Sequence, residues 1–139
     1  MQATLIQCTK SKRDEAAPAR NLYDESTYYC KMKEFAEANG RQWYILSAKH
    51  GLLHPNTVVE PYDDFGLSES QAQGIATKLV EKDVTHVDIV AGKKYTESLI
   101  PELEARGIEV KEYCKGLSIG KRMERLSKLT AECQNEQLC

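Results

Sequence analysis

The sequence contains no two cysteines at the CxxC spacing, although five cysteines occur among its 139 residues. Cysteine-based zinc sites depend on such close spacing, so a zinc site is not expected. An odd number of cysteines without a secretory signal also argues against a set of disulfide bonds. The glycine-rich phosphate loop of many nucleotide-binding proteins is missing as well. We expect neither a metal nor another cofactor.

The chain also lacks long apolar runs and an excess of positive charge. Its apolar runs are far shorter than the roughly 18 residues that a membrane helix needs. Met1 leads directly into a predicted strand rather than into a secretory signal. We therefore expect a cytoplasmic protein with no membrane partner. The formal net charge is −2, so a nucleic-acid partner would need a local basic patch.

Strand-like and helix-like segments alternate along the sequence. Short apolar runs predict strands at residues 3–7, 42–46, 86–91 and 108–113. Apolar residues at helical spacing predict helices at residues 25–39, 68–82, 93–105 and 119–133. This order is typical of a three-layer α/β fold, in which helices cover both faces of a mostly parallel four-stranded sheet. Residues 1–139 are expected to form one domain, because no repeat or linker interrupts them.

The most informative stretch is residues 43–64, WYILSAKHGLLHPNTVVEPYDD. It opens as a buried strand and continues as a long loop rich in reactive side chains. Long loops in compact domains are usually functional or disordered. The loop carries Leu52, Leu53, Val58 and Val59, which can pack against the body of the protein. We therefore predict a functional site here rather than disorder.

Ligands of parallel sheets bind beyond the carboxyl ends of the strands. Four segments of this chain are predicted to meet at that edge. They contribute Cys8, Thr9, Lys10, Ser11 and Lys12 after the first strand, Ser47, Lys49 and His50 after the second, Gly92 and Tyr95 after the third, and Cys114 after the fourth. This convergence predicts a shared substrate-binding pocket.

The first loop and the Lys49–His50 pair each have two interpretations. Residues 8–12 could cradle an anion through hydroxyls, backbone N–H groups and lysines, or could be a solvated basic loop. Lys49 could contact phosphate or, if desolvated, act as a nucleophilic amine, and His50 could act as an acid or a base. The alternative is a surface pair in a turn. Cys8 could be a small buried residue or, if it lies close to Cys114, have a redox role.

The segment Glu60–Asp63 offers carboxylates and an aromatic ring. Tyr62 could stack on a base, and Glu60 or Asp63 could orient water or a hydroxyl. The alternative is a packing tyrosine and a helix-capping aspartate. Gly92 begins a helix whose N-terminus could hold an anion or form an ordinary turn.

A basic stripe follows the last predicted strand. Its members are Lys115, Lys121, Arg122, Arg125 and Lys128. They could contact the phosphates of a nucleic acid. The alternative is a solvated helix face, since Glu124 and Glu132 interrupt the stripe.

Several motifs resemble a known family. They are the loop of residues 8–12, the Leu22–Tyr23 pair, SAKHGLL at residues 47–53, EPYD at residues 60–63 and GLSIGKRM at residues 116–123. Together they resemble small uncharacterised phage and microbial domains of the DUF6884 type, related to YaaA-type proteins and, more distantly, to the core domain of archaeosine synthases. YaaA-type proteins are larger and linked to DNA binding, and archaeosine synthases modify a deazaguanine base in tRNA. The resemblance implies a role directed at a base or a nucleic acid.

The leading hypothesis is an enzyme that acts on a nucleobase, as a DNA glycosylase or a base-modifying enzyme. Tyr62 would stack on the base, and Lys10, Lys12 and Lys49 would hold phosphate or developing charge. Asp63 or Glu60 would position water or a nucleophile, and His50 would transfer a proton. The alternatives are a non-catalytic nucleic-acid-binding protein and a nucleotide sensor.

Overall fold

The protein is a mixed α/β structure built on a five-stranded, mostly parallel sheet. This computed structural model describes residues 1–10 and 12–138, with side chains up to residue 134. The parallel strands are β1 (Gln2–Gln7), β3 (Gln42–Ser47), β6 (His86–Val90) and β7 (Glu109–Glu112). The strand order is β4-β3-β1-β6-β7, so β1 lies at the centre. Its residues from Ala3 onward are buried, as expected for a strand covered on both faces.

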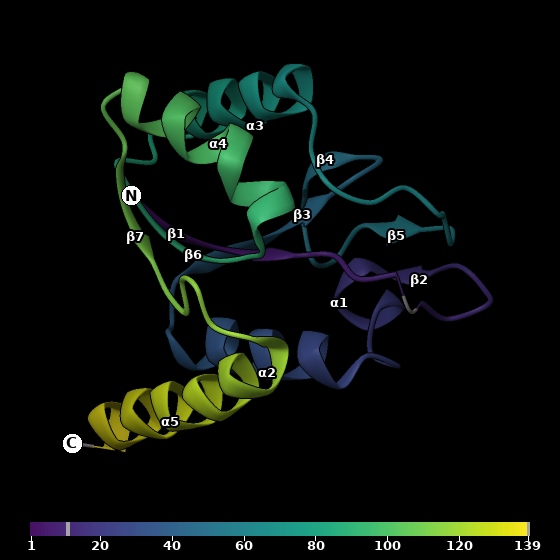
Figure 1. The fold of residues 1–139 in the computed structure, drawn as a ribbon, viewed down its shortest axis with the longest axis vertical. Coiled ribbons are helices and arrows are strands. Elements are labelled where there is room, and N and C mark those ends of the chain that lie inside the picture. The colour runs from purple at the N-terminus through teal and green to yellow at the C-terminus, as the bar shows by residue number, and fades with distance from the viewer. Residues whose placement is uncertain (11, 139) are drawn as a thin grey trace.

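Two pairs of helices flank the sheet. They are α2 (Thr27–Ala38) with α5 (Ile119–Leu138), and α3 (Glu69–Glu81) with α4 (Lys93–Ala105). Figure 1 shows α3 and α4 on one side of the strands and α2 and α5 on the other. No helix in the described part of the chain has the length and apolar character to cross a bilayer.

Local signals set the beginnings of the helices. The Ser26 side chain accepts a hydrogen bond from the Tyr29 N–H and caps α2. Ser68 and Gln71 form a reciprocal capping box at the N-terminus of α3. Ser68, rather than an aspartate of the EPYD segment, therefore caps α3.

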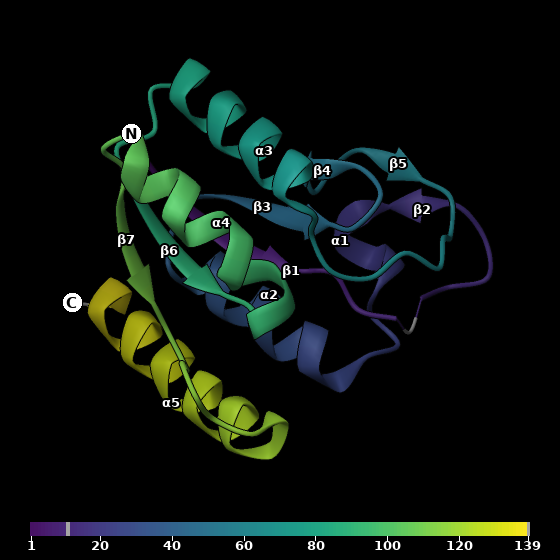
Figure 2. The same cartoon turned by 45° about the horizontal axis from the view of Figure 1, so that its top comes forward.

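The sheet has one strand more than the four predicted. The additional strand, β4 (Gly51–Leu53), pairs antiparallel with β3 and lies within the predicted long loop. The same loop contains β5 (Val58–Val59), which pairs with β2 (Ala17–Pro18) in a separate two-stranded sheet. The short helix α1 (Ala19–Leu22) follows β2. Figure 2 shows this small sheet and α1 beyond the carboxyl ends of β1 and β3. The last helix also continues to Leu138, past the predicted end at residue 133.

Candidate site at the carboxyl ends of the strands

Ser47, the last residue of β3, organises the turn that leads into β4. Its buried hydroxyl oxygen accepts the His50 N–H at 2.9 Å and the Lys49 N–H at 3.3 Å. Gly51 then adopts a φ of 72°, a left-handed conformation that glycine adopts without strain. This turn fixes the backbone of Lys49 and His50 at the edge of the sheet, while both side chains remain exposed.

A chain of hydroxyl groups joins Ser47 to two tyrosines. The hydroxyl of Tyr62 bonds to Ser47 Oγ at 2.8 Å and to the hydroxyl of Tyr23. Burial raises the pKa of both phenols, so they stay protonated. The Tyr62 side chain is only 7% exposed, and its ring packs edge-on against His50. A base could reach little of this ring, so Tyr62 does not provide the predicted stacking surface.

Cys8 and Tyr95 do come together, as the predicted pocket requires. The Cys8 Sγ and the Tyr95 hydroxyl lie 3.1 Å apart, and both side chains are fully buried. The Tyr95 oxygen also accepts the Gly66 N–H at 3.1 Å. These bonds tie the end of β1 to α4 and to the loop before α3. Cys8 and Cys114 are not joined by a disulfide, and burial raises the pKa of Cys114.

Lys12 is held over the tyrosine cluster. Its Nζ lies 4.5 Å from the ring centroid of Tyr62 and 5.8 Å from that of Tyr23. It also donates to the Lys10 carbonyl oxygen at 3.3 Å. Burial lowers the pKa of Lys12, although the nearby Cys8, Asp63 and Asp64 side chains oppose that shift. Lys12 is therefore partly buried, whereas Lys10, Lys49 and Lys94 are exposed.

Phe65 is the exposed aromatic ring of the site, and the sequence analysis missed it. It is 37% exposed and packs edge-on against Tyr95, with ring centroids 5.4 Å apart. The Nζ of Lys10 lies 5.1 Å and that of Lys94 5.4 Å from its centroid. An aromatic residue two positions after the EPYD motif was the available signal. Cations on an exposed ring are typical of sites for anionic aromatic ligands.

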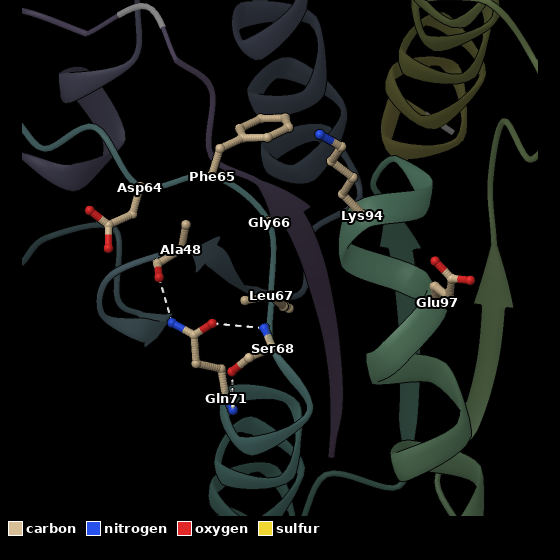
Figure 3. A pocket seen from close by; sticks show the side chains of 9 residues that line it. All are labelled: Ala48, Asp64, Phe65, Gly66, Leu67, Ser68, Gln71, Lys94 and Glu97. Atoms are coloured by element: carbon tan, nitrogen blue, oxygen red, sulfur yellow. Dashed lines mark hydrogen bonds between the residues drawn. The ribbon is translucent and has the colours of Figure 1, made fainter.

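An open pocket lies beside Phe65. Figure 3 shows Phe65 and Lys94 pointing toward each other at its mouth. Gln71 connects two segments that line the pocket. Its Nε2 donates to the Ala48 carbonyl oxygen, and its Oε1 accepts the Ser68 N–H. The pocket has a volume of about 860 Å³, within the range of roughly 300–1,000 Å³ that is typical of ligand sites.

The N-terminus of α4 lies next to Phe65, along a second groove. Its N-cap, Gly92, has no side-chain cap, and the Gly92 N–H donates to Gln7 Oε1. A Cβ at Gly92 would come within 3.2 Å of that oxygen, so the close approach favours glycine. The first turn carries Lys93 and Lys94 and no acidic residue. Positive side chains next to the positive end of the helix dipole are unfavourable unless an anion lies nearby.

Residues 3–128 match the family described as DUF6884, a family of unknown function. The chain belongs to this family. No curated protein and no solved structure matches the chain. The proposed relation to YaaA-type proteins and archaeosine synthases therefore stays a prediction.

One member of the basic stripe does not have its predicted role in this DUF6884 domain. Arg122 is 9% exposed, and its guanidinium donates to the carbonyl oxygens of Leu117 at 2.8 Å and Ala91 at 3.1 Å. It also donates to the Tyr28 hydroxyl at 3.3 Å. Arg122 thus anchors α5 to the end of β6 and is not free to contact phosphate. Lys115, Lys121 and Arg125 are exposed.

The remaining predicted site residues have different surroundings. Glu60 and Asp63 are exposed, whereas Thr9 is buried. Burial, together with the nearby Lys49, lowers the pKa of His50, so its imidazole is neutral at pH 7. Ser11 lies outside the described residues. Among those that are described, no group of His, Cys, Asp and Glu side chains could hold a metal ion.

Proposed function

We propose that this DUF6884 domain is an enzyme that acts on a nucleobase, within a nucleic acid or a nucleotide, and cleaves the glycosidic bond or modifies the base. The observation that carries this proposal is the exposed Phe65 ring with Lys10 and Lys94 beside it. A base can stack on such a ring, while ammonium groups neutralise the phosphate of the same nucleotide. Phe65 replaces Tyr62 in the stacking role.

The phosphate would lie between Phe65 and the N-terminus of α4. The two sides of this space carry Lys10, Lys93 and Lys94, and the open end of the helix adds backbone N–H groups. A base that stacks on Phe65 would displace one ammonium from the ring, and that ammonium would then reach the phosphate.

Proton transfer would fall to His50, and water would be positioned by Asp63 or Glu60. A neutral imidazole is a competent general base at neutral pH. Because the pKa of His50 is lowered from its ordinary value of 6.5, activity should decline on the acid side only below that value. A pH–rate profile checks this expectation.

The test is release or modification of a base from short oligonucleotides, single-stranded and duplex, that carry a panel of altered bases. Stacking contributes about 1–3 kcal/mol per base, so Phe65→Ala should raise KM by roughly 5- to 150-fold. Lys82→Ala is the matched control, because the Lys82 Nζ lies 5.8 Å from the Tyr44 ring away from the site. Equal activity of Phe65→Ala and wild type would remove the basis of the proposal.

One outcome would favour the non-catalytic alternative. Binding that weakens in Phe65→Ala, without any base release by the wild type, would indicate a nucleotide-binding protein. Salt-dependent affinity for oligonucleotides but not for mononucleotides would then identify nucleic acid as the ligand.

A further inference from the structure

A further cavity lies between α4, the end of β7 and the turn that leads into α5. We call it the α4–β7 cavity. Its volume is about 470 Å³, and Ile100 and Pro101 of α4 give it apolar surface. Figure 2 shows α4 between α3 and β7. The open pocket beside Phe65, which Gln71 of α3 helps to line, and the α4–β7 cavity therefore lie on either side of α4.

The second groove, at the N-terminus of α4, connects these two spaces. It has a volume of about 320 Å³ and shares Phe65 and Lys94 with the open pocket. It shares Lys93 and Arg122 with the α4–β7 cavity. The three spaces thus form one path around the first turn of α4. Such a path suits an extended ligand better than a compact one.

The charge changes along this path. Lys93, Lys94 and Arg122 line the second groove, and none of the described residues that line it is acidic. No ion pair between described residues includes any of these three cations. The outer spaces also contain carboxylates, such as Asp64 in the open pocket and Glu112 in the α4–β7 cavity. The path is therefore cationic in the middle and closer to neutral at its two ends, which matches the order nucleoside, phosphate, nucleoside.

We infer that the ligand is a dinucleotide unit of a single-stranded nucleic acid. One base stacks on Phe65, the linking phosphate lies in the second groove, and the neighbouring nucleoside occupies the α4–β7 cavity. This inference rests on the proposed function and names its substrate as a single strand rather than a free mononucleotide. Ile100 is then a specificity-determining residue for the neighbouring nucleoside.

The position of α4 between the two nucleosides excludes a stacked duplex. An α-helix is about 10 Å across with its side chains, whereas successive bases of a duplex strand lie only about 3.4 Å apart. Both spaces can be filled only when neighbouring bases move apart. Unstacked bases of single strands are splayed in this way when proteins recognise them.

Binding to the wild-type protein tests the inference without any substitution. The probes are thymidine 3′-phosphate, thymidine 5′-phosphate and the dinucleotide TpT, which carries the same single phosphate and one more nucleoside. Burial of that nucleoside should make TpT bind at least about tenfold more tightly than either mononucleotide. An analogue of TpT with either base removed should lose this gain. The matching uridine compounds distinguish RNA from DNA, and a gain in either series supports the inference.

A substitution in the α4–β7 cavity locates the second nucleoside. Ile100→Ala removes apolar contact, so the affinity for the dinucleotide should fall about fivefold while that for the mononucleotides changes less than about twofold. Val80→Ala is the matched control, because Val80 is a partly exposed apolar residue of α3 that lines none of the three spaces. Neither affinity should change in that variant.

The outcomes separate this inference from the proposed function. Base release from oligonucleotides together with equal affinities for TpT and the mononucleotides overturns the inference and leaves the proposed function standing. A dinucleotide gain that Ile100→Ala leaves intact also overturns it, because the second nucleoside then lies elsewhere. A gain that depends on Ile100 without any base release supports the inference and counts against a catalytic role. Absence of both binding and base release overturns the inference and the proposed function together.

Discussion

The two ends of the parallel sheet both bury polar side chains, but the buried side chains have different kinds of partners at each end. At the amino end, the Asp88 carboxylate is 2% exposed and accepts from Asn39 Nδ2 at 2.9 Å. It also pairs with Arg41 at 2.5 Å and with His86 at 2.9 Å. The two carboxylate oxygens of Asp88 thus have Asn39, Arg41 and His86 as partners.

At the carboxyl end, buried groups bond to one another, and no ion pair between described residues includes Lys10, Lys12 or Lys94. Cys8 bonds to Tyr95, and Ser47 bonds to Tyr62, whereas Lys12 lies over aromatic rings. Burial of polar groups therefore does not by itself indicate a site. A cluster that satisfies its own charges stabilises the fold, and a cluster that leaves charge available can act on a ligand.

The largest expected effect comes from breaking the paired cluster. Arg41→Ala leaves the buried Asp88 carboxylate without its nearest cation, which should lower the free energy of unfolding by about 3 kcal/mol. Urea denaturation measures this loss. Arg106→Ala is the matched control, because its pair with Glu102 lies on the surface of α4 and should contribute less than about 1 kcal/mol. Equal losses in the two variants would contradict the distinction between the clusters.

A smaller effect is expected at the hydroxyl chain. Tyr62→Phe removes the hydroxyl that joins Ser47 to Tyr23, and about 1 kcal/mol of stability should be lost with that buried hydrogen bond. Thermal or urea denaturation of Tyr44→Phe provides the reference, since no bond of the Tyr44 hydroxyl to another described residue is present. A Tyr62→Phe variant as stable as Tyr44→Phe would show that the chain of hydroxyls does not stabilise this end.

The smallest change in stability is expected at Lys12, where the carboxyl end of the sheet differs most from the amino end. Lys12→Met keeps the packing over the rings and removes the charge, so stability at pH 7 should stay within about 0.5 kcal/mol of wild type or rise. Because burial holds the folded-state pKa of Lys12 below its ordinary value of 10.5, the cost of the buried charge is present below that folded-state pKa. It disappears as pH rises toward 10.5. Any gain of Lys12→Met measured by urea denaturation at pH 7 should therefore shrink at pH 10, and a loss of stability at pH 7 would contradict the assignment.

The sequence predicted the mixed α/β fold and the placement of reactive segments at one edge, because strand order along the chain determines which strand ends meet. It missed β4, since three residues are too short to show a strand period. It assigned the stacking ring to Tyr62, because nothing local to the EPYD motif reveals the bond to Tyr23, which lies far away along the chain. Helical spacing placed Arg122 on the basic stripe but could not show that the Ala91 carbonyl and Tyr28 would meet its guanidinium.

Met1, the residue before β1, has a practical consequence. The Met1 amine donates to the Asp83 carbonyl at 3.2 Å, and the Met1 carbonyl accepts the Thr85 N–H at 2.9 Å. Figure 1 shows this end on the same side of the molecule as the last turns of α5, while β2 and β5 lie on the opposite side. A biosensor surface coupled through a linker at Met1 would thus hold the pocket outward, so the proposed binding of oligonucleotides can be measured without steric hindrance from the support.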